Sequence, residues 1–93
     1  MRTIDRTNQF KRDYKRELKG QHRATLEDEL AKALKALVSE VPLAERYYDH
    51  ALTGDWKNFR DCHIKPDLVL IYQKLNDKIL QLVRIGSHSE LGL

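Results

Sequence analysis

Apolar residues recur at helical spacing in the first part of the chain. Phe10, Tyr14 and Leu18 follow one another at intervals of four residues, a spacing that places side chains on one face of a helix. Basic residues occupy the opposite face. The pattern predicts a helix that begins at Asn8 and ends at Gly20, because glycine commonly terminates helices.

A second helix is predicted between Thr25 and Pro42. Its apolar stripe consists of Leu26, Leu30, Ala33, Leu34, Leu37 and Val38. Thr25 and Asp28 resemble a capping box in which aspartate replaces the usual glutamate. Acidic residues fill the first turns and lysines come later, which complements the helix dipole. The two helices together form a helical hairpin.

After Pro42 the pattern changes to short apolar runs separated by turn residues, which is typical of strands. The run from Leu68 to Gln73 is rich in β-forming residues and is interpreted as a buried central strand. The complete expected order is a short edge strand at 2–6, the helical hairpin, a loop at 43–55, a strand at 56–63, a turn at 65–67, a strand at 68–73, a hairpin turn at 76–77, a strand at 78–85 and a tail at 86–93.

The expected architecture is a single α+β domain that spans residues 1–93. A domain of this size buries only about 60% of its unfolded surface. The apolar stripes of both helices need a partner, so the helical hairpin should pack on one face of a small antiparallel sheet. The opposite face of the sheet is expected to stay open.

Successive side chains of a strand point to opposite faces, and this alternation predicts what the open face carries. The residues expected to share one face of the first meander strand are Lys57, Phe59, Asp61 and His63. Those expected to share one face of the last strand are Leu80, Leu82 and Arg84. We expect His63, Asp67 and Arg84 to meet on this face. His50 from the loop and His88 from the tail should lie at its rim.

The charge distribution favours an anionic partner. The chain has a net charge of +3, and its basic residues are concentrated between residues 2 and 23, where contact with a polyanion is expected. Cys62 is the only cysteine, so no internal disulfide is possible and nothing indicates an oxidising compartment. No stretch approaches the ~20 apolar residues that span a bilayer. We expect a cytoplasmic protein that does not enter a membrane.

Three of the four histidines lie in the last 44 residues, each beside groups that suit acid–base catalysis. His50 follows Asp49, His63 closes the run Arg60-Asp61-Cys62-His63, and His88 follows Arg84. Imidazole both takes and gives a proton near neutral pH. Imidazoles beside carboxylates and a guanidinium are therefore consistent with general acid–base attack on a phosphodiester.

Four motifs follow one another in this part of the chain. They are His-x-Leu-x-Gly-x-Trp at 50–56, Arg-Asp-x-His at 60–63, Pro-Asp-x-x-x-x-Tyr at 66–72 and Arg-x-Gly-x-His-x-x-Leu at 84–91. With the chain length and the helical hairpin, this string resembles the YafQ-type branch of the RelE superfamily, the toxins of bacterial type II toxin–antitoxin pairs. The resemblance covers the whole chain and implies a RelE-like fold.

The resemblance also implies an activity: ribosome-dependent endonucleolytic cleavage of mRNA in the A site. Without metal or cofactor, the ribose 2′-OH attacks the adjacent phosphate and leaves a 2′,3′-cyclic phosphate. His50, His63, Asp67 and His88 would be the acid–base set. Arg84 would stabilise charge on the phosphate and Asp61 would support a histidine. Contacts to RNA and the ribosome would come from Lys11, Arg12, Lys15, Arg16 and Lys57.

The implied partners are mRNA on the ribosome, ribosomal RNA and a DinJ-like antitoxin. Such an antitoxin has a disordered acidic segment that wraps the basic toxin and folds on binding. The implied complex is a heterotetramer of two toxins and two antitoxins, and the free toxin would be a monomer. The sequence departs from the resemblance at its end, where Gly92-Leu93 stands in place of a frequent phenylalanine.

Two other functions remain open at this point. The basic first helix and the altered C-terminus would also suit a ribosome- or nucleic-acid-binding module that blocks its target without catalysis. A metal-dependent hydrolase is the third option, because three histidines and two aspartates could ligate zinc. The histidines lack a local pair such as His-x-x-x-His, so this signal is poor.

Overall fold

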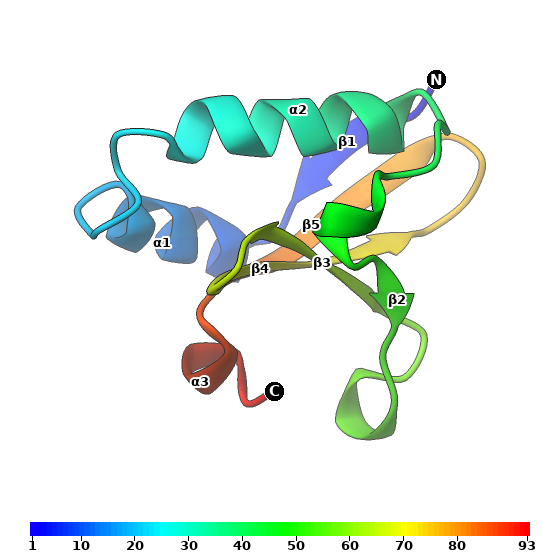
Figure 1. Ribbon diagram of the computed structural model, residues 1–93. Coiled ribbons are helices and arrows are strands. Elements are labelled where there is room, and N and C mark those ends of the chain that lie inside the picture. The colour runs from blue at the N-terminus through cyan, green and yellow to red at the C-terminus, as the bar shows by residue number, and fades with distance from the viewer.

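A five-stranded sheet runs through the centre of the molecule, with the strand order β1-β5-β4-β3-β2. The computed structural model describes all residues 1–93 (Figure 1). Strand β1 pairs parallel to β5, and the remaining neighbours are antiparallel. The strands are β1 (Thr3–Arg6), β2 (His50–Ala51), β3 (Arg60–Lys65), β4 (Leu68–Lys74) and β5 (Ile79–Gly86).

Two long helices, α1 (Asn8–Glu17) and α2 (Leu26–Val38), follow the first strand. Both contribute to one core cluster with the strands: Phe10 comes from α1 and four buried residues come from α2. Figure 1 shows α2 lying across one face of the sheet, with α1 beside it. The prediction of an α+β fold with a helical hairpin on a small sheet is confirmed, although β1 makes the sheet mixed.

The two helices begin in different ways. Helix α1 begins at Asn8 as expected, because the Thr7 hydroxyl accepts the Phe10 amide at 3.0 Å. The expected capping box at Thr25 is wrong, since its side chain makes no capping hydrogen bond. The amides of Thr25 and Leu26 both donate to the His22 carbonyl instead. Helix α2 therefore continues directly from a preceding turn.

The segment between α2 and β3 is more ordered than the expected loop. It contains the 3-10 turns η1 (Glu45–Tyr47) and η2 (Gly54–Trp56), with the short edge strand β2 between them. The strand expected at 56–63 begins only at Arg60, because the amides of Lys57 and Phe59 are used in turn hydrogen bonds. His50 lies on strand β2 rather than in a loop.

A β-bulge changes which residues of β5 share a face. Tyr72 pairs with Leu82 but Ile71 pairs with Arg84, so Val83 is an extra residue in the ladder. Leu82 packs in the core beneath the helices, whereas Arg84 lies opposite Ile71, which belongs to a separate cluster. The expected common face for Leu80, Leu82 and Arg84 is wrong, because the alternation resets at the bulge.

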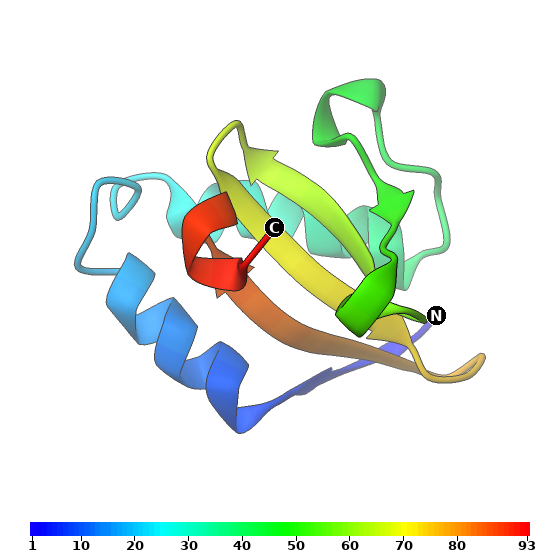
Figure 2. The same ribbon diagram turned by 90° about the horizontal axis from the view of Figure 1, so that it is seen from below.

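The face of the sheet away from α2 is partly covered, not open. A third helix, α3 (His88–Leu91), lies across it (Figure 2). Leu91 packs there with Val69 and Ile71, and Leu52, Trp56, Phe59 and Val83 surround them. The expected C-terminal tail is thus a helix, which holds His88 over the sheet. None of the helices has the length and apolar character that would span a membrane.

Candidate active site

Strand register brings the candidate residues into two neighbouring rows. His50 pairs with Asp61, Asp61 with Ile71, and Ile71 with Arg84. The adjacent row joins His63, Val69 and Gly86, two residues before His88. Directly paired residues place their side chains on the same face of a sheet. The rows therefore explain how residues distant in sequence meet.

His50 is held by one ring nitrogen. Its Nδ1 lies 2.9 Å from the Tyr48 carbonyl oxygen, which accepts a hydrogen bond, and 2.9 Å from Oδ1 of Asp61. The Asp61 side chain is 4% exposed, and its Oδ1 atom has no hydrogen bond of good geometry. Donation from Nδ1–H to the Tyr48 carbonyl leaves Nε2 as the nitrogen with a lone pair.

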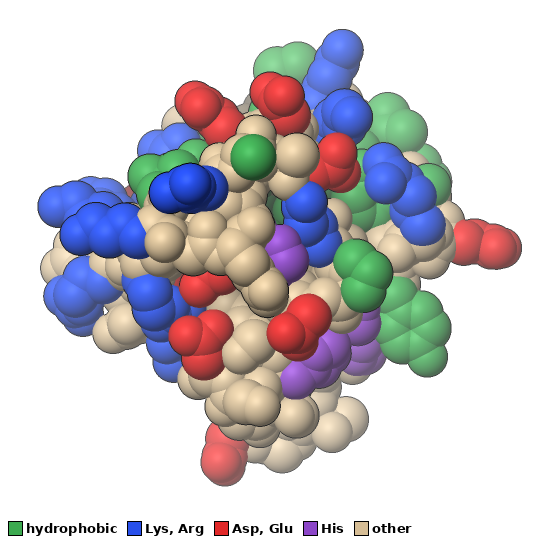
Figure 3. All heavy atoms as spheres, turned by 60° about the vertical axis from the view of Figure 1, so that its left-hand side comes forward, with side chains coloured by type: hydrophobic (Ala, Val, Ile, Leu, Met, Phe, Trp, Pro, Cys, Tyr) green, Lys and Arg blue, Asp and Glu red, His purple; other side chains and the backbone are tan.

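His63 and His88 form the other part of the site. Their ring centroids are 5.0 Å apart and the rings are edge to face. Nδ1 of His88 lies 3.5 Å from Oδ1 of Asp67, in the turn that joins β3 to β4. Figure 3 shows the histidines beside acidic side chains on the molecular surface. The structure thus groups three imidazoles and two carboxylates.

Burial and charge act in opposite directions on these groups. Burial raises the pKa of Asp61, against the influence of the three nearby imidazoles. Burial lowers the pKa of His63, and the charges of His88 and His50 lower it further, whereas Asp61 raises it. A lowered pKa keeps the His63 imidazole neutral at pH 7. A neutral imidazole can accept a proton or a hydrogen bond from a substrate.

Arg84 reaches toward α1. Its Nε and Nη2 atoms donate to the Asp13 carboxylate at 2.9 and 3.0 Å, and the Ile85 amide donates to it as well. Burial alone would raise the pKa of Asp13, but hydrogen bonds from Arg84, Gln9 and the Ile85 amide lower it. Only Nη1 of Arg84 makes no hydrogen bond within the chain. Asp13 therefore occupies the Nε–Nη2 edge of the guanidinium, and the Nη1–Nη2 edge keeps its remaining N–H donors.

Comparison with known proteins identifies the family. The family model described as "Bacterial toxin of type II toxin-antitoxin system, YafQ" matches residues 2–92. The chain belongs to the YafQ toxin family. The mRNA interferase toxin YafQ of Escherichia coli K12 is 38% identical over 91 residues, which cover 97% of this chain and 95% of that protein.

Solved structures of the family have the same fold. The E. coli DinJ-YafQ complex contains a chain that is 35% identical, with a TM-score of 0.78 and 98% of each chain covered. A metal-bound toxin from Helicobacter pylori is 44% identical, with a TM-score of 0.80, and covers 98% of this chain and 99% of its own. In the present chain no three His, Cys, Asp or Glu side chains are grouped so as to hold a metal ion.

The edge strand that carries His50 is attached by groups that sequence reasoning overlooked. Arg60 donates to the Asp49 carboxylate, with Nη2 to Oδ2 at 3.2 Å, and the buried Tyr72 hydroxyl donates to Asp49 as well. Burial raises the pKa of Tyr72, so its hydroxyl stays protonated and can donate. Asp49 directly precedes His50, and this adjacency was the available signal.

Helix α3 is attached by its capping box and by α1. The Ser87 hydroxyl accepts the Glu90 amide, and the Glu90 carboxylate accepts the Ser87 amide. Nε of Arg16 lies 3.1 Å from the Glu90 carboxylate, and its Nη2 donates to the Ile85 carbonyl. The pattern Ser87-x-x-Glu90 is a sequence signature of a helix start, so α3 was predictable.

The five predicted RNA contacts lie in different environments. Lys11, Lys15 and Lys57 are exposed and have no ion pair, and Arg12 bonds only to Gln9. Arg16 is instead engaged by Asp13, Glu17 and Glu90. Figure 3 shows several Lys and Arg side chains on the left of the view, with others at the top and on the right. Four of the five are thus free to meet an anion.

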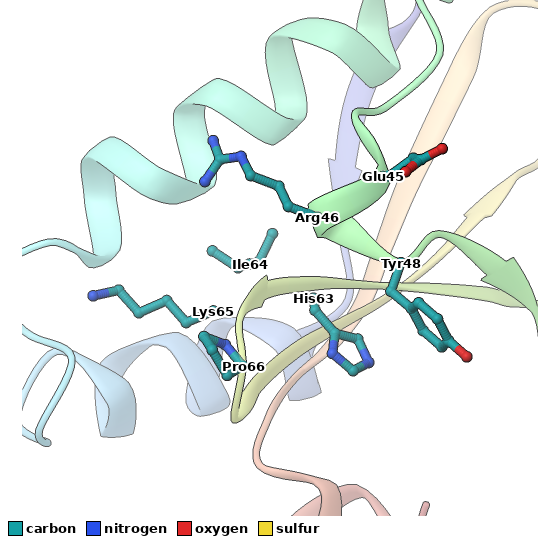
Figure 4. Close-up of a pocket in the computed structure, with 7 residues that line it drawn as sticks. All are labelled: Glu45, Arg46, Tyr48, His63, Ile64, Lys65 and Pro66. Atoms are coloured by element: carbon teal, nitrogen blue, oxygen red, sulfur yellow. The ribbon is translucent and has the colours of Figure 1, made fainter.

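A pocket of about 660 Å³ adjoins His63. Figure 4 shows the seven residues around it. They are Glu45, Arg46, Tyr48, His63, Ile64, Lys65 and Pro66. Lys65 makes no ion pair or side-chain hydrogen bond, and Tyr48 is 67% exposed. The pocket therefore combines a free cation and an accessible aromatic ring beside the imidazole cluster.

Proposed function

We propose that this chain is a ribosome-dependent mRNA endoribonuclease. The observation that carries the proposal is the grouping of His50, His63 and His88 around the buried Asp61 carboxylate. Membership of a family whose E. coli relative is named an mRNA interferase supports the same activity. The reaction is attack of the ribose 2′-OH on the adjacent phosphate, which yields a 2′,3′-cyclic phosphate and a 5′-OH.

His50 is our first choice for the general base, and Asp67 is the rival. Because its Nδ1 faces the Tyr48 carbonyl at 2.9 Å, the Nε2 lone pair is available to take the 2′-OH proton. The buried Asp61 carboxylate then lies 2.9 Å from the imidazolium that forms. This is the supporting role that we assign to Asp61, because a nearby negative charge stabilises a protonated imidazole.

His88 is proposed as the general acid for the 5′-oxygen leaving group. Its Nδ1 lies 3.5 Å from the Asp67 carboxylate, which can orient the ring so that Nε2 faces the leaving group. His63 lies between the two other histidines and has a lowered pKa. Its neutral ring can share either role or orient the substrate.

Arg84 is proposed to act on the phosphate through the Nη1–Nη2 edge of its guanidinium. Asp13 accepts one N–H from Nε and one from Nη2, so both N–H groups of Nη1 and the second of Nη2 are available for non-bridging oxygens. The proposed contacts to RNA and the ribosome are Lys11, Arg12, Lys15 and Lys57, with Arg16 supporting α3. Charge stabilisation of this kind often contributes as much as a well-placed acid or base.

A cleavage assay in a translating extract tests the proposal. We expect His88→Ala to lower the cleavage rate by about 10²–10⁴-fold, the contribution of one general acid. His22→Ala is the matched control, since that histidine lies in the turn before α2 and its ring has only Gln21 as a hydrogen-bond partner. Undiminished cutting by His88→Ala would remove the proposed acid.

Three further experimental outcomes distinguish the proposed nuclease from the alternative functions. Cutting of naked mRNA at the same rate as ribosome-bound mRNA would contradict ribosome dependence. Growth arrest with intact transcripts would instead favour a binding module without catalysis. Loss of cutting on addition of a chelator would contradict the metal-independent mechanism, which is a prediction from the resemblance.

We also propose a DinJ-like antitoxin as the partner. The relative from E. coli has been solved as a DinJ-YafQ complex, and the exposed Lys11 and Lys15 of α1 suit an acidic segment that folds on binding. The proposed complex contains two toxins and two antitoxins, and the free chain is a monomer. Light scattering of the purified chain with and without the partner measures both masses.

A further inference from the structure

Tyr48 is an exposed aromatic residue beside the imidazole cluster, and the acid–base chemistry gives its side chain no role. It is the one aromatic residue among the exposed large apolar side chains, at 67% exposure. Its ring centroid lies 5.4 Å from that of His50 and 5.5 Å from that of His63. The interplanar angles are 71° and 59°, so neither imidazole covers the phenol as a parallel partner would.

The backbone of Tyr48 has an uncommon conformation for a bulky residue. Its φ of 49° and ψ of 45° lie in the left-handed region, which asparagine and glycine adopt more readily. The residue ends η1, where its amide donates to the Glu45 carbonyl, and its own carbonyl accepts from His50. Strained residues gather at functional sites, where the side chain is used. The strain therefore directs attention to the ring.

Tyr48 separates two hollows of opposite charge character. The pocket of about 660 Å³ beside His63 contains Arg46 and the free Lys65 (Figure 4). The hollow beside His50, of about 800 Å³, contains Asp49, and Glu45 borders both. A phosphate is attracted to the first and repelled by the second. A nucleotide that stacks on Tyr48 would thus direct its phosphate toward Lys65.

We propose that Tyr48 is a base-stacking platform for the nucleotide next to the cleaved bond, with the flanking phosphate in the pocket lined by Lys65. The inference rests on the proposed nuclease function and names a substrate subsite for it. Stacking on an aromatic ring tolerates every base, because each has a π-face. Tyr48 thus contributes affinity for the RNA strand and holds the scissile linkage beside the histidines, without selecting a sequence.

Two substitutions separate the ring from the backbone. Tyr48→Asn removes the ring but suits the left-handed conformation, so the melting temperature should stay level or rise. Its affinity for ribosomes programmed with an mRNA that is 2′-O-methylated at the cleavage position should fall by roughly 5- to 100-fold, the value of one stacked base. Tyr48→Phe keeps the ring and should bind like the unaltered chain. Fluorescence anisotropy of the labelled toxin measures the affinity.

An abasic substitution tests the stacking itself. One abasic nucleotide is placed in turn at each position that flanks the cleavage site of the methylated mRNA. At one position the missing base should weaken binding of the unaltered chain as much as Tyr48→Asn does. The same abasic mRNA should not weaken binding of Tyr48→Asn any further. Equal abasic penalties for both proteins at every position would overturn the inference.

A control substitution away from the histidines and the cleavage assay complete the test of Tyr48. Leu75→Asn removes another exposed apolar side chain, directly after the end of β4, and should leave RNA affinity unchanged. In the cleavage assay Tyr48→Asn should raise KM and leave kcat unaltered.

Unchanged cutting by Tyr48→Asn would overturn the proposed stacking role of Tyr48 and leave the nuclease function standing. If the unaltered chain does not cut, but its RNA binding depends on Tyr48, the nuclease function fails and the platform stands. Loss of affinity for an acidic protein segment alone would make Tyr48 a protein contact and overturn the inference.

Discussion

The two ends of the histidine cluster are attached to the fold in different ways. His50 lies on the two-residue edge strand β2, which is fixed by Asp49, Arg60 and Tyr72 near the surface. His88 lies on α3, and the support for that helix runs through Arg16 to the buried Asp13 of α1. The first attachment is local to the sheet edge, whereas the second links the first helix to the last.

The difference indicates how each end should respond to damage. The Asp13 side chain is 0% exposed and joins Arg84, Arg16 and the Ile85 amide. Loss of a buried charge pair is costly because a partner is left uncompensated. The Asp49–Arg60 pair is partly exposed, and water can replace much of what it provides. Mutations around His88 should thus affect stability, and those around His50 should mainly affect catalytic geometry.

Asp13→Ala should have the largest effect on stability. It leaves Arg84 and the Ile85 amide without their shared acceptor, and we expect a loss of about 3 kcal/mol in the free energy of unfolding, the lower end for a broken buried ion pair. The lower end applies because the Arg84 side chain is 24% exposed and can turn toward water. Urea unfolding measures the change. Asp5→Ala, which loses one exposed hydrogen bond to Gln81, is the control.

The decline of stability at acidic pH should also depend on the Asp13 carboxylate. The pKa of Asp13 is lowered below its unfolded value of 3.8, so the native state keeps the charge when the unfolded chain takes a proton. The stability due to Asp13 is present above that unfolded value and is lost as pH falls through the folded pKa. Asp13→Asn should therefore flatten the decline of stability at acidic pH. An Asp13→Asn variant whose free energy of unfolding declines as steeply at acidic pH as that of the unaltered chain would contradict this role of Asp13.

Gly86→Ala should have the next largest effect. A Cβ atom there would lie 2.8 Å from Nη2 of Arg16 and 3.2 Å from Oε1 of Glu90. Both side chains are held by other bonds, so the overpacking should cost about 1–3 kcal/mol and displace α3 with His88. Gly20→Ala has its nearest neighbour at 3.6 Å and is the matched control. Thermal unfolding and the cleavage rate are measured for both.

Tyr72→Phe should have a smaller effect on stability. It removes the hydroxyl that donates to Asp49, and a typical hydrogen bond contributes about 0.5–1.5 kcal/mol. Tyr14→Phe is the control, because the Tyr14 hydroxyl makes no hydrogen bond within the chain. We expect Tyr72→Phe to lower kcat more than the stability loss explains, because β2 and His50 lose an anchor. If Tyr72→Phe had the same kcat as Tyr14→Phe, the Tyr72 hydroxyl would not be needed to hold His50 in place.

The smallest expected change is in the titration of one imidazole. Burial lowers the pKa of His63 below 6.5, while Asp61 raises it. In Asp61→Asn that raising influence is lost, so the pKa of His63 should fall further. Asp67→Asn should leave it unmoved. NMR titration of the imidazole protons follows each histidine, and an upward shift in Asp61→Asn would contradict the described electrostatics.

Local sequence patterns predicted most of the fold. The stripe of α2 and the apolar run of β4 are long enough for periodicity to decide their type. The bulge at Val83 was not predictable, because it depends on how β4 and β5 pair rather than on either sequence alone. The placement of Arg84 against Asp13 follows from that bulge. Ser87 and Glu90, by contrast, gave a local signal for α3 that the tail interpretation overlooked.

The candidate site was less predictable than the fold. The histidines and Asp67 stand out by residue type, but their convergence depends on register and on β2, which is too short to leave a period in the sequence. Asp13 looks like any polar residue on the charged face of α1. Its burial comes from the packing of α1 against β5, a tertiary relation that no window of sequence contains.

The parallel pairing of β1 with β5 has a consequence for biosynthesis. Thr3 pairs with Ile79 and Arg6 with Leu82, so the first strand has no neighbour in the sheet until β5 has been synthesised. His88 follows β5 and is made later still. The nascent chain therefore cannot assemble its imidazole cluster before β5 and the His88 segment that follows it have been synthesised.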